Sequence, residues 1–167
     1  MGTMLLYIVI MRNLAILDVF AISAGFVIRA AAGALVISAS PSPWLYVCTG
    51  LGALFIGFAK RRQELITLGD KSVSHRNSLG QYSENMLDHL ITMLMSATLI
   101  AYILYTFTAE NLPSNNAMMF TIPFVTFAIA RYFHLIHAKQ AGGNPEDILI
   151  KDIPTLLSVL LWITATI

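Results

Sequence analysis

The chain has 167 residues, of which 57% are hydrophobic and only 11% are charged. Soluble domains carry about 25% charged residues, so this composition excludes a soluble globular protein and indicates an integral membrane protein. The net charge of +1 says little by itself, because the positions of the charges matter more than their sum, and no nucleic-acid partner is expected. The single cysteine, Cys48, excludes a disulfide within one chain.

Four apolar segments meet or approach the length of about 20 residues that a helix needs to cross the hydrocarbon core. They are Leu14–Ile37, Pro43–Ala59, Leu87–Phe107 and Ala117–His137. A fifth segment, Pro154–Ile167, is apolar but ends early. We therefore expect an all-α fold, a polytopic bundle of about five transmembrane helices that forms one integral membrane domain over residues 1–167.

The charged residues lie almost entirely on one side of this expected bundle. The short connections on one face contain no Lys or Arg, whereas the other face carries Arg12 and the two longer loops, 60–86 and 138–153. Of the ten Lys and Arg residues only Arg29 lies away from that face, and of the nine acids only Glu110 does. The positive-inside rule then predicts that the charged face is cytoplasmic, in the inner or plasma membrane of the cell.

The longest polar stretch, residues 60–88, joins two expected spans. Its candidates for ligand binding are Lys60, Arg61, Arg62, Glu64, Arg76 and Tyr82. On a continuing helix Lys60 and Glu64 share a face, so the cation could hold a phosphate while the carboxylate orients a hydroxyl or holds Mg²⁺. Arg76 and Tyr82 follow a turn and could close over the ligand. The alternative is that these charges only fix the topology, since cytoplasmic loops are rich in Lys and Arg in any case.

Two charged residues lie within the first apolar segment. Asp18 and Arg29 are eleven residues apart, about three helical turns, so they share a face. Small residues on or beside that face, such as Gly25 and Gly33, allow close helix approach, so we expect the stripe to point into the bundle. An intramembrane arginine is a functional candidate by default. Arg29 could instead pair with an internal acid or carbonyl groups, or extend to the membrane surface.

A second basic group is Arg131, His134 and His137, spaced i, i+3 and i+6 near the cytoplasmic end of a span. The two histidines could bind a metal, but zinc sites usually need three or four ligands and no third ligand has a clear spacing. A positive helix end near lipid headgroups is favoured, with Arg131 as a phosphate-binding candidate because its planar fork suits bidentate contact. Asp152 before Pro154 predicts a helix N-cap.

Seven segments distributed along most of the chain carry a resemblance to a known family. They are residues 16–20 (ILDVF), 25–34 (GFVIRAAAGA), 42–44 (SPW), 60–65 (KRRQEL), 82–83 (YS), 131–137 (RYFHLIH) and 142–154 (GGNPEDILIKDIP). In this order they resemble the UbiA-type prenyltransferase superfamily, specifically its decaprenyl-phosphate phosphoribosyltransferase branch. Ordinary prenyltransferases of this family have an Asp-x-x-x-Asp second motif, and the matching positions here are Lys60 and Glu64. A lysine at the first position suits a phosphorylated sugar donor.

The resemblance implies a membrane-bound transferase. Such an enzyme would transfer a 5-phosphoribosyl group from phosphoribosyl diphosphate to a polyprenyl phosphate, with Mg²⁺, and release diphosphate in a step of cell-wall lipid biosynthesis. The transition state would resemble a sugar cation, so catalysis would depend on holding the leaving diphosphate and aligning the lipid phosphate. Glu64 is the one residue that the resemblance implies as a metal ligand.

The family's first Asp-rich motif is absent from this sequence. That motif lies on earlier helices of a nine-helix fold, of which this chain supplies counterparts of roughly the last five. The resemblance therefore implies the C-terminal part of a UbiA-like transferase, a truncated form that could be inactive alone. Helix faces left open by the missing part could drive homo-oligomer formation.

Two other functions stay open on the sequence alone. The chain could belong to a prenyltransferase that moves a prenyl group to an aromatic or lipid acceptor, although Lys60 in place of Asp argues against it. It could also be a non-enzymatic membrane scaffold or transporter fragment, with Asp18 and Arg29 lining a pathway.

Overall fold

The computed structural model describes residues 15–36, 43–68, 78–109, 112, 117–138 and 151–166. Its elements, in chain order, are α2 (Leu17–Val36), α3 (Pro43–Leu68), the 3₁₀ turn η2 (Leu79–Gln81), α5 (Glu84–Thr108), the 3₁₀ turn η3 (Ala117–Thr121), α6 (Ile122–Ala138) and α8 (Ile153–Thr166). The described residues form helices and their connections, with no strand among them. The predicted all-α membrane bundle is therefore confirmed.

Four of the described helical segments are long and apolar enough to cross a membrane, namely α2, α3, α5, and η3 together with α6. The fifth, α8, is apolar but has only 14 residues, as predicted for the last segment. At about 1.5 Å per residue, the 20 residues of α2 span roughly 30 Å, the thickness of the hydrocarbon core. The chain is an integral membrane protein.

The second span is longer than its apolar run predicts. The sequence suggested that the span ends at Ala59, but α3 continues to Leu68. The added residues, KRRQELITL, are mostly good helix formers. Arg61 and Arg62 are also buried against neighbouring segments, so the extension is stabilised by tertiary contacts. The first part of the predicted polar loop is thus the end of helix α3.

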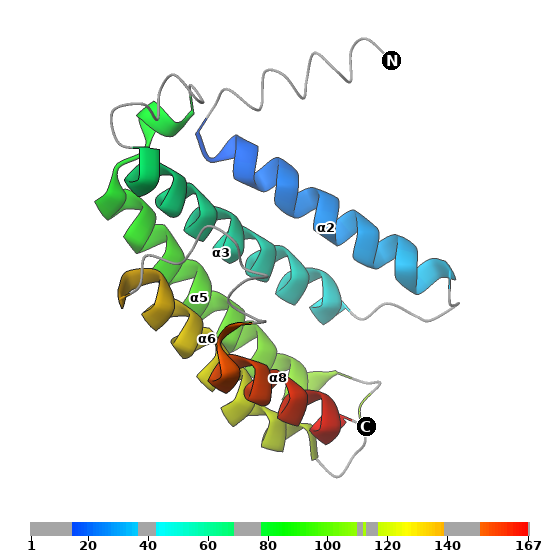
Figure 1. Cartoon of the computed structure of the whole chain (residues 1–167). Helices are drawn as coiled ribbons and strands as arrows, with labels where there is room; N and C mark the ends of the chain where they lie inside the picture. The colour runs from blue at the N-terminus through cyan, green and yellow to red at the C-terminus, as the bar shows by residue number, and fades with distance from the viewer. Residues whose placement is uncertain are drawn as a thin grey trace.

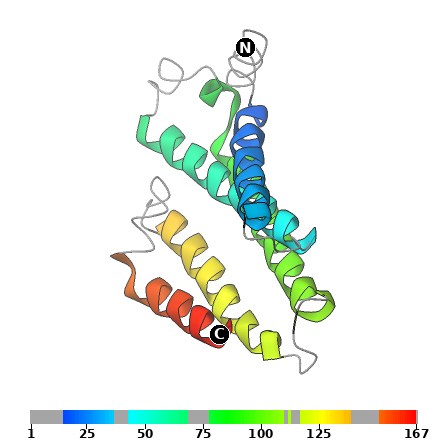
Figure 2. The same cartoon turned by 90° about the vertical axis from the view of Figure 1, so that its right-hand side faces the viewer.

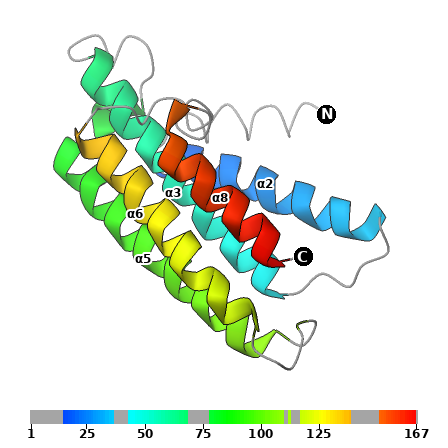
Figure 3. The ribbon, with the colours of Figure 1, turned by 60° about the horizontal axis from the view of Figure 1, so that its bottom comes forward.

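The helices pack as two groups that meet along α5. Helix α3 packs against α2 on one side and α5 on the other, whereas α6 packs against α8. Figures 1 and 2 show α2, α3 and α5 in one layer, with α6 and α8 beside them. Figure 3 shows α6 lying along α5, with α8 on its other side. Contacts of α6 and η3 with α5 join the two groups.

The buried core lies toward the end of the bundle where α2 begins and α3 finishes. It contains apolar side chains from α2, α3, α5 and α6, including Val19, Phe58, Leu87, Ile91 and Ile136. Edge-to-face aromatic pairs reinforce it. Phe58 packs on Tyr82 with ring centroids 6.3 Å apart, and Phe55 packs on Tyr132 at 5.3 Å. Such pairs add about 0.5–1.5 kcal/mol beyond area burial.

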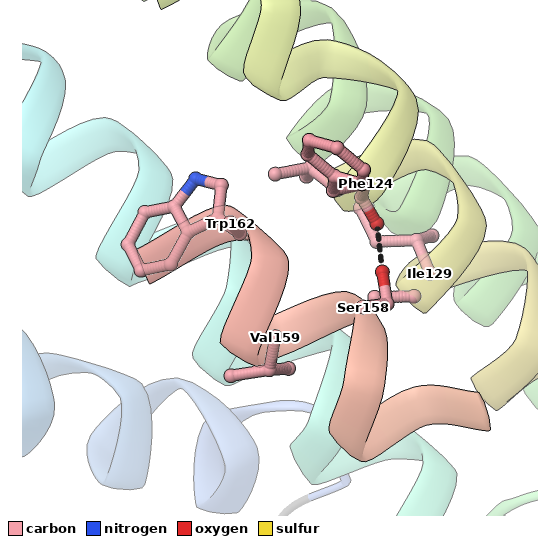
Figure 4. Close-up of a pocket in the computed structure, with 7 residues that line it drawn as sticks. Phe124, Ile129, Ser158, Val159 and Trp162 are labelled. Carbon is pink, nitrogen blue, oxygen red and sulfur yellow. Dashed lines mark hydrogen bonds between the residues drawn. The ribbon is translucent and has the colours of Figure 1, made fainter. Parts of the chain in front are cut away.

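The opposite end is joined by uncharged hydrogen bonds. The Tyr102 hydroxyl lies 2.6 Å from Thr121 Oγ1 and accepts a 2.7 Å hydrogen bond from the Trp162 indole. Ser158 donates to the Phe124 carbonyl at 2.7 Å, beside a small apolar pocket of about 240 Å³ between α6 and α8 (Figure 4). The pocket lining is apolar, which makes it unsuitable for an anionic ligand.

Helices α2 and α3 approach closely where Gly57 faces Val19. A Cβ added at Gly57 would lie 2.5 Å from Val19 Cγ1, whereas a Cβ at Gly52, on the same helix, meets nothing within 4 Å. Val19 is almost fully buried and its β-branched side chain has few alternative rotamers. Glycine at position 57 is therefore needed for this helix contact.

We expect Gly57→Ala to lower the free energy of unfolding by about 1 kcal/mol, because overpacking of about 1–3 kcal/mol exceeds the helix-propensity gain of alanine. Gly52→Ala is the matched control and should be neutral or stabilising by up to about 1 kcal/mol. Thermal unfolding followed by circular dichroism in detergent compares the two. Equal melting temperatures for both variants would contradict the close contact.

Candidate functional site

The charged side chains that the structure describes gather at one end of the bundle. The start of α2, the end of α3, the start of α5, the end of α6 and the start of α8 all lie toward this end (Figure 1). We call it the charged end. Its Asp, Glu, Lys and Arg residues, together with the paired His137, are Asp18, Lys60, Arg61, Arg62, Glu64, Glu84, Asp88, Arg131, His137, Lys151 and Asp152. Among the charged Asp, Glu, Lys and Arg residues in the described ranges, Arg29 alone lies away from it.

The most buried charges at this end belong to Arg61 and Asp18. Their side chains are 5% and 1% exposed, and Arg61 Nε lies 3.0 Å from Asp18 Oδ2. Arg61 Nη1 also donates to Glu64 Oε2. Since burial of a lone charge costs several kcal/mol, each of these groups requires the other to remain inside the bundle. The pair therefore links the first turn of α2 to the end of α3.

Tyr82 completes this cluster from the segment before α5. Its hydroxyl donates to Asp18 Oδ1 at 3.1 Å and accepts a hydrogen bond from the Ile16 N–H. Burial raises the pKa of Tyr82 to about 12, and the nearby Asp18 carboxylate adds to the shift. The phenol is therefore neutral near pH 7 and acts as the donor to Asp18.

The entry into α2 is held by the same segment. Ile16 has a φ of 71°, which is an unusual backbone conformation for a β-branched residue. Its N–H is bound by Tyr82, and the preceding Ala15 N–H donates to Gln81 Oε1 at 3.2 Å. These contacts satisfy backbone groups that precede the helix and compensate for the strained geometry.

Arg62, the next residue, organises a second cluster between α3, α5 and α6. Its Nη2 donates to Glu84 Oε1 at 3.0 Å, and its Nε donates to Asp88 Oδ1. His137 Nε2 lies 3.2 Å from the same Asp88 oxygen, which joins the end of α6 to the cluster. Ser83 caps α5 by accepting from the Met86 N–H at 3.2 Å, so the first turns of α5 present both acids.

A third ion pair joins α6 to α8. Arg131 makes a bidentate contact with Asp152, at 3.0 Å from Nε and 2.8 Å from Nη2. Asp152 also accepts from the Thr155 N–H at 3.2 Å and from the Thr155 hydroxyl at 2.7 Å, as an N-cap does. The Arg131 guanidinium and the Thr155 donors hold the pKa of the Asp152 carboxyl well below its usual range. The predicted cap is confirmed, and Arg131 is already paired with a protein carboxylate.

The structure brings together some of the sequence-predicted residues and separates others. Asp18, Arg61, Glu64 and Tyr82 form one cluster. Lys60 and Glu64 lie four residues apart on the continuing helix α3, as expected, but Glu64 binds Arg61, three residues before it, while Lys60 is exposed. Residues three or four apart can contact each other on a helix, and here the Glu64 carboxylate binds the buried Arg61.

The prediction that Asp18 and Arg29 both point into the bundle is also wrong for Arg29. Asp18 is buried, whereas Arg29 is exposed within the described chain. The two share a helix face, but Arg61 and Tyr82 cover that face only near Asp18. Arg76 lies outside the described residues.

Several partners at this end were not among the sequence candidates. Glu84 and Asp88 are needed to explain why Arg62 is buried, and His137, considered from the sequence only for metal or headgroup binding, joins them through Asp88. The signal available in the sequence was the i, i+4 spacing of Glu84 and Asp88, which places two acids on one face of α5. Within the described ranges, no three side chains of His, Cys, Asp or Glu come together as a metal site.

The fold and this end of the bundle define a helical integral membrane protein whose buried arginines and acids converge at one surface. No protein-family model matches the chain. It is similar to the decaprenyl-phosphate phosphoribosyltransferase of Mycolicibacterium smegmatis, with 29% identity over 160 residues, 92% of this chain and 50% of that protein.

Two further relatives carry the same name. The protein of Corynebacterium glutamicum is 26% identical over 154 residues, 91% of this chain and 46% of its own length. That of Mycobacterium tuberculosis strain H37Rv is 29% identical over 153 residues, 92% and 50%. The chain spans about half the length of the curated relatives it matches. The resemblance predicted from the sequence is thereby confirmed.

We expect Asp18→Asn to lower the free energy of unfolding by about 3 kcal/mol, because it removes the counter-charge of a buried arginine. Glu84→Gln is the control, since the Glu84 side chain is 56% exposed and an exposed ion pair contributes about 0–1 kcal/mol. Unfolding in a denaturing-detergent titration measures both. Similar losses for the two variants would show that burial of the Asp18–Arg61 pair is unimportant.

The Asp152 contact predicts a pH dependence. Its folded-state pKa lies below the ordinary value of 3.8, so ionised Asp152 stabilises the folded protein above about pH 4, and this contribution is lost progressively as the pH falls below that value. Asp152→Asn should therefore lower the free energy of unfolding near pH 7. The difference in this free energy between the variant and the wild-type protein should become smaller at low pH. Fluorescence of Trp162, in a Trp44→Phe background, follows α8. A pH-independent difference between the two proteins would contradict the assignment.

Proposed function

We propose that this chain is part of a membrane transferase that moves a 5-phosphoribosyl group from phosphoribosyl diphosphate to a polyprenyl phosphate. The observation that carries the proposal is the similarity, over more than 90% of the chain, to three proteins named decaprenyl-phosphate phosphoribosyltransferase. We further propose that residues 1–167 form one membrane domain and that the charged end faces the cytoplasm, where a soluble sugar phosphate is accessible.

The charged end supplies two kinds of side chain for this reaction. Asp18, Arg61, Arg62 and Tyr82 are buried and bound to one another or to neighbouring acids, so their proposed role is to fix the ends of α2, α3 and α5 around the donor. Lys60 is exposed on the same turn of α3. We propose that the Lys60 ammonium group, a point charge on a flexible side chain, contacts a substrate phosphate directly.

The remaining candidates have less direct support. Arg131 would contact a lipid phosphate only by sharing its guanidinium with Asp152. Arg76 stays a candidate from the sequence, and Arg29 lies away from the charged end. Arg29 differs from the other cations because it is exposed and lies over the Phe26 ring.

Mg²⁺ remains a prediction from the resemblance. Proteins often bind Mg²⁺ through one or two carboxylates together with substrate phosphates. Glu64 could supply one carboxylate, but its Oε2 is held by Arg61, and the described residues bring no cluster of three potential ligands together. These residues do not form a preformed Mg²⁺ site, so no catalytic step is assigned to the ion.

The proposal is tested with the chain reconstituted in lipid bilayers. Radiolabelled phosphoribosyl diphosphate, decaprenyl phosphate and Mg²⁺ should give a labelled lipid and free diphosphate, either with the chain alone or after co-expression with the remaining half of the Mycolicibacterium smegmatis relative. A prenyl diphosphate with an aromatic acceptor is the competing substrate pair. Turnover of the prenyl pair alone, or no lipid product in either preparation, would reject the proposed reaction.

In the active preparation we expect Lys60→Gln to reduce the rate of lipid labelling about 10- to 100-fold, since a charged hydrogen bond to phosphate contributes about 1.5–3 kcal/mol. Lys139→Gln is the control for loss of one positive charge elsewhere in the sequence and should leave the rate within about twofold. An unchanged rate for Lys60→Gln would remove Lys60 from the proposed phosphate contact.

A further inference from the structure

Arg29 is a charged side chain within a membrane span that has no protein counter-charge among the described residues. Its guanidinium lies over the Phe26 ring, 5.5 Å from the centroid, and no ion pair or hydrogen bond to the rest of the described chain accompanies this contact. Arg29 and Phe26 are both exposed. A charge at this position is costly in a bilayer, so it requires a partner.

Arg29 lies outside the strip of α2 that packs on the middle of α3. Val19, Ser23 and Val27 define the side of α2 that packs on α3: Val19 contacts the position of Gly57, Ser23 donates to the Gly50 carbonyl at 2.9 Å, and Val27 lies beside Gly50. At 100° per residue, Arg29 lies about 160°, 120° and 80° around the helix from Val27, Ser23 and Val19, respectively, and its side chain is exposed. It therefore lies on the open side of α2.

The depth of Arg29 argues against a lipid headgroup as the partner. Twelve residues separate it from the start of α2 and seven from its end, which corresponds to about 18 Å and 10 Å along the axis. Helical side chains point toward the N-terminus of their helix, and the position of the guanidinium over Phe26, three residues earlier, agrees with this direction. Arg29 thus points toward the middle of the span and away from its nearer end.

The surface around Arg29 can admit another helix. Gly25 and Gly33 lie one turn before and one turn after it, and a Cβ added at either glycine meets nothing within 4 Å. Small residues at this spacing allow two helix backbones to approach closely in a membrane. Near Asp18 the same face of α2 is already covered by Arg61 and Tyr82, so a helix placed alongside Arg29 would continue a surface that the protein uses for packing.

We propose that the face of α2 formed by Gly25, Phe26, Arg29 and Gly33 docks a transmembrane helix that carries an Asp or Glu near its midpoint. A second copy of this chain does not fit this requirement, because every acid that the structure describes lies at the charged end, and copies in one membrane share their orientation. Glu110 is the one acid that the sequence places on the face opposite the charged end, and it is predicted to lie in a connection between spans and not within one. This inference is independent of the proposed transferase reaction.

The test uses synthetic helices of defined chemistry. The chain and a 22-residue Leu/Ala peptide with one central Glu are reconstituted in phosphatidylcholine bilayers, and association is measured by energy transfer against a peptide with Gln at the same place. The Glu peptide should bind at least tenfold more tightly. Arg29→Leu should abolish the difference, Arg29→Lys should retain it, and Arg29→Glu should transfer the preference to a peptide with a central Lys.

Ile28→Leu is the matched control, since Ile28 is 67% exposed beside Arg29, and it should leave the preference unchanged. Equal binding of the Glu and Gln peptides to the wild-type chain would overturn the proposal without any variant. Arg29-dependent self-association without a peptide would identify a second copy as the occupant. An Arg29 effect that appears only with phosphatidylglycerol would identify a lipid headgroup. Either of these results would also overturn the proposal.

Discussion

The ion pair between Arg61 and Asp18 is the interaction on which the charged end depends. Both groups are almost fully removed from solvent, so neither could occupy its position alone without a large desolvation cost. Their contact determines where α2 begins relative to the last turns of α3. Tyr82 then adds the segment before α5 through Asp18. One pair of opposite charges thus defines the relative placement of three segments that are distant in sequence.

The two ends of the bundle are held by different chemistry. At the charged end, three clusters of opposite charges join α2, α3, α5, α6 and α8. At the other end, Tyr102, Thr121 and Trp162 are connected by uncharged hydrogen bonds. Because lipid tails are as apolar as leucine side chains, burial of apolar surface does little to select helix neighbours in a membrane. Polar contacts at both ends provide that selection.

The sequence was sufficient to predict the helical spans, because an apolar run of about 20 residues has the length that a helix needs to cross the hydrocarbon core. Asp18 and Tyr82 were both candidates from the sequence, and the structure places them in contact. The Asp152 cap was predicted from its neighbour Pro154 and is confirmed. The partners of the arginines were not predictable in the same way. Whether Glu64 binds Lys60 or Arg61 depends on which side of α3 is covered, and the role of His137 depends on how α6 packs beside α5. These are properties of the tertiary arrangement, which local spacing does not encode.

Arg61 and Arg62 are consecutive, and their side chains leave α3 about 100° apart. One is bound by α2 and the other by α5 and α6. A turn of α3 about its own axis would separate both guanidinium groups from their acids at once, and so would a shift along that axis by one residue. The adjacent arginines therefore determine both the rotation of α3 about its axis and its position along that axis.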